Sequence, residues 1–382
     1  MSLWLHVRPG FWYEIMASDG VAVGTRWAGG KLVQKGTEKP AQPTAEAGPL
    51  APMYRRRLIV KLDDLQDFSL VHFQRVVGAI GENGGTADLG INAGRCEKAV
   101  FDWVRRLDPS RFEVWNHTWD HGAKGPKHRA LPLDVQYENI DKVQRKVKEE
   151  LGRTPHAFGQ PGIPYKGGWI GDQDEVTYLA VRMHPELVAI YDGGRTAKRL
   201  GLEGEMDPLF DPVALVSFES PPGDWDRGDP NKRYRVDYVA KKYPGEDPER
   251  PPICGNAEEL KWRIDHPSTD LAEVDRQGGA YAQFHPWFWK LDSDVAALGE
   301  WVSYVNEQKA WRFSNCYDAF TWWRDSAFLA IEKTAPDRYR IDARRLRFEH
   351  RLELDLPAEP KVEAQAWVTD RGLEGGQGRP WA

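Results

Sequence analysis

The chain has few cysteines, and their spacing excludes two kinds of site. Cys96, Cys254 and Cys316 are the only three among 382 residues, and none stands in a CxxC pair. An odd number of widely spaced cysteines supports neither a disulfide framework nor a thiolate metal site. We therefore expect buried free thiols.

Long apolar runs and a strong charge of one sign are also missing. No segment approaches the roughly eighteen apolar residues of a membrane span, and the first six residues lack the basic and apolar parts of an export signal. The net charge is −6 at pH 7, too small to predict a polyanion-binding surface. We expect neither a membrane nor nucleic acid as partner. As it stands the chain predicts a cytoplasmic protein, and export would require a signal peptide that has been removed.

Tryptophan, in contrast, is abundant, with 17 residues, and 41% of the chain is hydrophobic. A sizeable core can therefore form. The indole ring has a flat apolar face and one N–H donor, so it suits stacking against sugar rings as well as core packing. The length fits one large barrel domain with appendages.

Strand-like and helix-like segments alternate through the middle of the chain. We expect strands at residues 58–62, 87–91, 112–115, 157–159, 188–191, 215–218 and 280–284, and helices at 69–82, 96–107, 133–151, 294–306 and 317–333. This alternation predicts a parallel (β/α) barrel, in which the C-terminal ends of the strands bear the chemistry.

The two ends of the chain have a different pattern. Residues 11–35 contain short β-type runs and the turn signals Asp19-Gly20 and Gly29-Gly30, which predict hairpins, and residues 36–52 resemble a linker. Residues 339–356 alternate polar and apolar side chains, and we expect them to pair with the N-terminal hairpins. The predicted division is 1–52 for the hairpins and linker, 53–335 for the barrel and 336–382 for the C-terminal strands and tail.

Acidic and histidine side chains follow three of the predicted strands. Asp63 and Asp64 end the first, His117 and His121 follow the third, and His285 follows the last. Two histidines four residues apart, which we expect on one side of a helical turn, form with one carboxylate a common ligand set for a catalytic divalent ion with a position open to water. Each pattern alone has an ordinary explanation, such as two unrelated histidines or a helix N-cap. Their joint occurrence favours a metal-dependent hydrolase.

The segments KLDDL, NHTWDHG and QFHPW resemble the first, second and last motifs of the polysaccharide deacetylases, the NodB-homology or carbohydrate esterase family 4-like proteins. The resemblance covers roughly Leu58 to Asp325. It implies an irregular (β/α)7 barrel of the α/β class, to which we add a small antiparallel β appendage from the two termini. It also implies a metal-dependent hydrolase that removes acetyl groups, chiefly N-acetyl, from a polysaccharide or oligosaccharide.

The resemblance also implies a role for each residue of these motifs. Asp63 is the expected general base, and Asp64, His117 and His121 are the expected ligands of one divalent metal ion. His285 is the expected acid that protonates the leaving amine. Zinc is the default ion, but aspartate and histidine also accept cobalt, nickel or manganese.

The third and fourth motifs of the family fit less well. The third normally contains an arginine that orients the base aspartate, whereas the corresponding loop, 158–165, has none. Gln160 could hydrogen-bond Asp63, an arginine from elsewhere could replace the missing one, or the loop could be only a rigid turn. The fourth motif, usually Asp-Trp, fits either Asp224-Trp225 or Tyr191-Asp192. The candidate substrate residues are Trp119, Gln160, Pro161, Tyr165, Trp225 and Trp287.

Two other functions remain open. The missing arginine and the long segment 195–275 favour a related barrel hydrolase that acts on another non-peptide C–N bond, such as an allantoinase-like or cyclic-imide hydrolase. A non-catalytic carbohydrate-binding barrel is the second alternative, although retention of five ionisable groups at strand ends argues against it. The expected partner is an acetylated glycan or a small acylated substrate, and a homo-oligomer is compatible with the sequence.

Overall fold

The structure is a computed structural model that divides into two compact units. One contains Met1–Arg55 and Thr321–Ala382, and the other contains Arg56–Phe320. The residues described are 2–7, 9, 11–17, 56–121, 131–161, 163–165, 168–170, 175–192, 209–218, 257–265, 267, 271–289, 291–308, 310–326, 328–335, 338–355 and 360–366.

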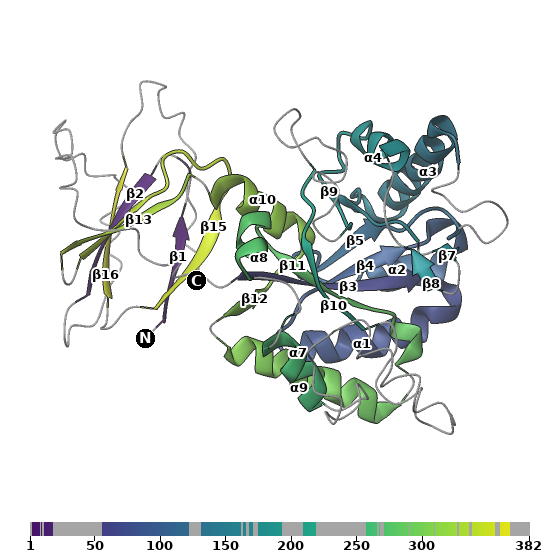
Figure 1. Cartoon of the computed structure of the whole chain (residues 1–382), viewed down its shortest axis with the longest axis horizontal. Helices are drawn as coiled ribbons and strands as arrows, with labels where there is room; N and C mark the ends of the chain where they lie inside the picture. Colours follow the sequence, from purple (N-terminus) through teal and green to yellow (C-terminus); the bar gives the residue numbers. More distant parts are fainter. Residues whose placement is uncertain are drawn as a thin grey trace. The chain divides into compact units, whose positions relative to one another are not determined.

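The larger unit alternates strands and helices along the chain (Figure 1). Its elements are β3 (Arg56–Leu65), η1 (Asp67–Ser69), α1 (Leu70–Glu82), β4 (Ala87–Ile91), η2 (Ala93–Arg95), α2 (Lys98–Val104), β5 (Phe112–Asn116), α3 (Leu133–Leu151), β6 (Ala157–Phe158), β7 (Ile163–Tyr165), β8 (Gly168–Ile170), α4 (Glu175–Arg182), β9 (Ala189–Ile190), β10 (Val213–Phe218), α7 (Ala257–Asp265), α8 (Leu271–Gln277), β11 (Ala280–Phe284), η4 (Pro286–Phe288), α9 (Asp292–Glu307) and β12 (Trp311–Phe313). The helix α10 (Cys316–Ser326) begins in this unit, and its residues from Thr321 on belong to the smaller one.

Seven parallel strands form a curved sheet in the order β10-β11-β3-β4-β5-β6-β9, and β12 also pairs with β3. The two ends of this sheet approach each other because Phe210, just before β10, forms a parallel bridge with Ala189 of β9. The predicted (β/α)7 barrel is therefore confirmed. Its strands run parallel, so their C-terminal ends meet at one end of the barrel.

Several helices follow directly from their apolar periodicity. In α1 the buried side chains recur every three or four residues, at Phe73, Val76, Val77 and Ile80. In Figure 1, α1, α7 and α9 lie on one side of the sheet and α3 and α4 on the other. The expected helix at 317–333 is wrong in its second half: α10 ends at Ser326, and β13 (Ala330–Ala335) follows.

A tryptophan ring lies inside the barrel below the C-terminal ends of the strands. Trp115 of β5 is fully buried, and a Cβ added at Gly90 or Gly159 would lie 2.3 or 2.5 Å from its ring. Only glycine leaves space for the indole at these two positions. Trp289 and Trp301 are also fully buried, so core packing is what the structure shows for them.

The smaller unit is built from strands of both termini. β1 (Ser2–Val7) pairs antiparallel with β15 (His350–Asp355). In a second sheet the order is β13-β14-β2-β16, with β2 (Phe11–Ala17), β14 (Arg338–Asp342) and β16 (Pro360–Ala366). C-terminal strands occupy both edges of β2, so β2 does not form the expected hairpin with the residues that follow it. The turn signals at 19–20 and 29–30 lie outside the described residues.

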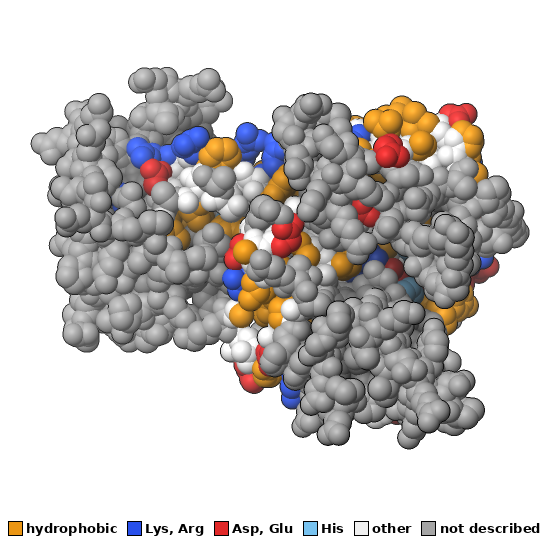
Figure 2. Space-filling model, viewed as in Figure 1, with side chains coloured by type: hydrophobic (Ala, Val, Ile, Leu, Met, Phe, Trp, Pro, Cys, Tyr) orange, Lys and Arg blue, Asp and Glu red, His pale blue; other side chains and the backbone are white. Residues whose placement is uncertain are grey.

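Figure 2 shows orange, apolar side chains at the upper right of its view, where α3 and α4 lie. Among the described residues, Leu133 and Val135 of α3 and Leu179 of α4 are exposed apolar side chains. No helix in the described part of the chain is long and apolar enough to cross a membrane.

Candidate metal centre

A β-bulge places two adjacent carboxylates at the end of β3. The pairing of β3 with β4 shifts between Leu62 and Leu65, where three steps along β3 match two along β4. Asp64 has a left-handed backbone with φ of 70°. Successive side chains of a regular strand point to opposite faces, and a bulge redirects one of them. The strand therefore does not end at the two aspartates, as the sequence suggested, but continues through them to Leu65.

The two histidines are held by a turn with two left-handed residues. His117 follows β5 directly, and Thr118 and His121 have φ of 68° and 60°. The expected helical turn is therefore wrong, since a right-handed helix requires negative φ at these positions. Asn92 donates a side-chain hydrogen bond to the carbonyl of His117, and Asn116 Oδ1 accepts from the Thr118 amide at 3.0 Å. These bonds fix the turn.

Asp64, His117 and His121 form a compact group, in which one potential ligand atom of each residue lies within 4.8 Å of the others. Asp64 Oδ1 is 3.3 Å from His117 Nε2 and 3.1 Å from His121 Nε2. Two ligand atoms about 2.1 Å from one ion lie about 3.0–3.4 Å apart at octahedral or tetrahedral angles. The spacing therefore fits a shared divalent ion.

The hydrogen bonds of His117 support the same conclusion. Its Nδ1 lies 2.9 Å from the carbonyl oxygen of Gly159. A carbonyl only accepts, so Nδ1 carries the proton and Nε2 presents a lone pair to Asp64 Oδ1. That carboxylate oxygen is buried and accepts no hydrogen bond among the described residues. Two electron-rich atoms facing each other across 3.3 Å are the donor set that a cation would satisfy.

Electrostatics keep both groups in the forms that bind a metal. Burial lowers the pKa of His117, and its interaction with Asp64 offsets this only in part, so the neutral imidazole is favoured. Burial raises the pKa of Asp64, but in acid the protonated forms of His117 and His121 donate to it and attract its charge, which holds that pKa well below the ordinary value. Asp64 is therefore a carboxylate at neutral pH.

Asp63 lies beside this group but has a different partner. Both of its oxygens contact Lys61 Nζ, at 2.5 Å for Oδ1 and 2.7 Å for Oδ2. His285, which follows β11, has Nε2 3.9 Å from Asp63 Oδ2 and 3.9 Å from Asp64 Oδ2. The structure thus brings together all five residues proposed from the three motifs.

An aromatic wall borders the group. Trp287 Nε1 donates to Asp64 Oδ2 at 3.3 Å. The Phe68 ring lies edge-on to Trp287 with centroids 6.2 Å apart, and its side chain is 62% exposed. Val71, in the first turn of α1, is equally exposed. Trp287 therefore contacts a candidate ligand on one side and an exposed ring on the other.

The other candidate substrate residues differ in position. Trp119 is half-buried against the core, and its backbone amide donates to Asn139 Oδ1. Gln160 and Pro161 are buried beyond β6. Gln160 Oε1 accepts from Thr177, and its Nε2 makes no hydrogen bond among the described residues, so Gln160 does not tether Asp63.

The structure describes some of the fourth-motif candidates, but it does not describe the side chains of the remaining two candidate substrate residues. Tyr165 belongs to β7, but its side chain lies outside the described part, as do Asp224 and Trp225. Asp192 is buried after β9, and its amide donates to Asp211 Oδ1 at 2.9 Å. Tyr191 donates its hydroxyl hydrogen bond to Asp88 at 2.7 Å, inside the barrel.

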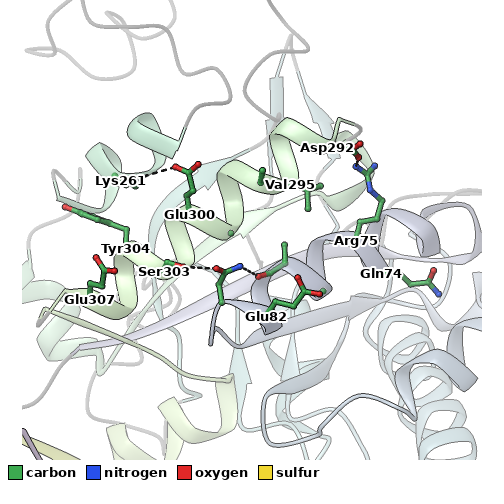
Figure 3. Close-up of a pocket in the computed structure, with 15 residues that line it drawn as sticks. Gln74, Arg75, Glu82, Lys261, Asp292, Val295, Glu300, Ser303, Tyr304 and Glu307 are labelled. Carbon is green, nitrogen blue, oxygen red and sulfur yellow. Dashed lines mark hydrogen bonds and ion pairs between the residues drawn. The ribbon is translucent and has the colours of Figure 1, made fainter.

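The described part of the larger unit also has a groove away from these residues. A groove of about 790 Å³ lies between α1 and α9, and Figure 3 shows its lining side chains. Ion pairs between Arg75 and Asp292 and between Lys261 and Glu300 join residues of its lining. None of the five motif residues lines it. Neither histidine nor cysteine is among its lining residues, and the metal centre remains the candidate functional site.

Two residues of the site were missed in the sequence. Lys61 looked like one more residue of a buried strand, although a charged residue in a fully buried strand must have a partner, and that signal was available. Phe68 gave no signal, because exposed aromatic residues in loops are common.

Fold and site together define a parallel barrel with a candidate divalent-metal centre at the C-terminal ends of its strands. No family model matches the sequence, and no curated protein matches it. Solved structures similar to the chain include a family 4 acetyl xylan esterase from Clostridium thermocellum in complex with a cobalt ion (14% identity, TM-score 0.43, 70% of this chain and 91% of that one).

Two further similar structures come from bacilli. The peptidoglycan deacetylase PdaC from Bacillus subtilis has 12% identity and a TM-score of 0.40 over 72% of this chain and 96% of its own. A pseudoenzyme of the CE4 family from Bacillus anthracis has 13% identity and a TM-score of 0.40 over 70% and 66%. At these values the functional argument rests on the geometry of this chain's own residues.

Proposed function

We propose that this protein is a metal-dependent hydrolase that removes acetyl groups, chiefly N-acetyl, from a glycan. One observation supports this above all others. The bulge at Asp63 and Asp64 presents two carboxylates side by side, and only Asp64 faces the imidazoles of His117 and His121. One carboxylate is therefore free to bind a metal while the other handles a proton.

The residues divide the work of hydrolysis as follows. Asp64, His117 and His121 would hold a divalent ion, which when bound polarises the acyl oxygen and makes water more acidic. Asp63 accepts the proton that water loses as its oxygen attacks the acyl carbon. His285, within 3.9 Å of both carboxylates, protonates the leaving nitrogen as the C–N bond breaks. The products are acetate and the free amine.

The aromatic wall supports a glycan as substrate. Phe68 is an exposed aromatic side chain at the border of the site, and Trp287 lies between Phe68 and Asp64. Sugar rings have apolar faces that stack on aromatic rings, while their hydroxyls remain in water. A small substrate without such a face would gain nothing from this wall. Zinc remains the default ion for this donor set, and cobalt, nickel and manganese are compatible with it.

The test combines metal analysis with acetate release. We expect about one divalent ion per wild-type chain, little in His117→Ala or His121→Ala, and full metal with lost turnover in Asp63→Asn. His156→Ala is the matched control, because His156 lies before β6 and pairs with Glu113 at 2.6 Å, away from the metal centre. Full metal content in both ligand variants would contradict the assignment.

The same measurements separate the alternatives. Acetate release from acetylated sugars supports the deacetylase. A bound ion without acetate release from any acetylated sugar or oligosaccharide would favour a related hydrolase of another C–N bond. Sugar binding with no ion after reconstitution would favour a binding barrel.

A further inference from the structure

Lys61 is a buried cation whose partner is the proposed general base. Its exposed fraction is 4%, the same as that of Asp63. The ammonium lies 2.5 and 2.7 Å from the two Asp63 oxygens and 3.1 Å from Gln283 Oε1. A single ammonium thus contacts both oxygens of one carboxylate.

Three aromatic rings enclose the same ammonium. Lys61 Nζ is 4.5 Å from the ring centroid of Trp115, 5.5 Å from that of Tyr191 and 5.9 Å from that of Tyr281. The faces of such rings attract cations, most strongly where water is excluded. Burial lowers the pKa of Lys61, and the charge and hydrogen bond of Asp63 oppose this. The rings and the carboxylate therefore confine the ammonium to one position.

The sequence encodes this arrangement within one strand and its neighbour. Lys61 precedes Asp63 by two residues, so the two side chains point to the same face of β3. Gln283 is the partner of Lys61 in the parallel pairing of β11 with β3, which places it on that face as well. Gln160, in the described part of the loop after β6, accepts a hydrogen bond from Thr177 and makes none with Asp63.

We propose that Lys61 is the positioning residue for the general base: it fixes the Asp63 carboxylate by both oxygens and supplies its counter-charge. This inference rests on the proposed function. A carboxylate has about four lone-pair sites, so Asp63 can still accept a proton from water while it is held. Because Asp63 has its own cation, Asp64 is left to the two histidines and a metal ion.

The experiment is a double-mutant cycle in kcat, KM and metal content with Lys61→Met, Asp63→Asn and the double variant. We expect Lys61→Met to keep its metal and its KM within about twofold and to lose about 100-fold in kcat. The double variant should be no slower than Asp63→Asn, because Lys61 acts only through Asp63. Lys98→Met is the control, since Lys98 is exposed and pairs with Asp102 on α2.

Stability measured on the same proteins provides a readout that is independent of turnover. Lys61→Met leaves a buried carboxylate without its cation, so it should be less stable than the double variant, in which both groups are neutral. If Lys61→Met is too unstable to purify, Lys61→Gln, which retains a hydrogen-bond donor, replaces it in the kinetic cycle.

Three results would each overturn the role of Lys61. They are a wild-type kcat in Lys61→Met, losses in kcat that add up in the double variant, and losses in stability that add up in the double variant. A metal-loaded wild type that releases no acetate would instead contradict the proposed function, and the stability cycle would still decide whether Lys61 and Asp63 form a pair. Failure of the inference and failure of the function are thus distinguishable.

Discussion

Trp287→Phe tests how Asp64, the proposed metal ligand, is held. The substitution keeps an aromatic ring in the wall but removes the N–H that donates to Asp64 Oδ2. Hydrogen bonds to charged groups contribute about 1.5–3 kcal/mol. At 3.3 Å this one is slightly longer than the usual range, so we take the lower end, about 1.5 kcal/mol, which is a loss of slightly more than tenfold in metal affinity. Loss of a partner of a metal ligand commonly costs 10–100-fold, roughly in agreement.

The assay is competition for the metal between the protein and a chromophoric chelator, without substrate. Trp289→Phe is the matched control: it makes the same change two residues later, where the indole is fully buried and Nε1 has no hydrogen-bond partner among the described residues. Unchanged affinity in Trp287→Phe, or an equal loss in both variants, would refute the role of this hydrogen bond.

Three other predictions concern packing, pH and substrate binding. Gly159→Ala places a methyl 2.5 Å from the Trp115 ring and should lower the free energy of unfolding by about 1–3 kcal/mol. The control Gly78→Ala, with no atom within 4 Å of the new Cβ, should not destabilise the protein. Equal melting temperatures for the two variants would contradict this prediction. Burial raises the pKa of Asp88 well above its ordinary value, so the native state retains a proton that the unfolded state loses, and stability should fall as the pH rises above about 4 and level off above the native pKa. Asp88→Asn should make the free energy of unfolding, measured with urea across about pH 4–8, fall less steeply with pH. An unchanged pH dependence would show that Asp88 is not the group that retains the proton. Phe68→Ala should raise KM for a glycan about 2–10-fold with little change in kcat, and an unchanged KM would exclude Phe68 from stacking.

Element bounds were predicted best where the sequence pattern lies within a single strand or helix. The ranges of β4, α3 and β11 agree with their predicted bounds, because each is a short apolar run or a long amphipathic repeat between turn residues. Asp64, His117 and His121 were expected to meet because parallel strands end together. The roles of the five site residues stay predictions until metal and turnover are measured.

What the sequence did not show depends on contacts between distant segments. The alternating pattern of residues 339–356 predicted their pairing with the N-terminal strands, as β14 and β15 do, but β2 was expected in a local hairpin and lies instead between β14 and β16, more than 300 residues later. Asp64, Thr118 and His121 have left-handed backbones, which residues other than glycine adopt uncommonly. Tertiary hydrogen bonds decide these conformations.

The adjacent aspartates show how one strand can support two different chemical tasks. Strand periodicity alone would direct Asp63 and Asp64 to opposite faces, and only one would reach the site. The bulge brings both to the same end of the barrel, where two buried carboxylates without cations would repel each other. Lys61 neutralises the first, and the second faces imidazoles that cannot neutralise it while they are uncharged. The remaining negative charge on Asp64 is therefore the electrostatic reason to expect a divalent cation at this position.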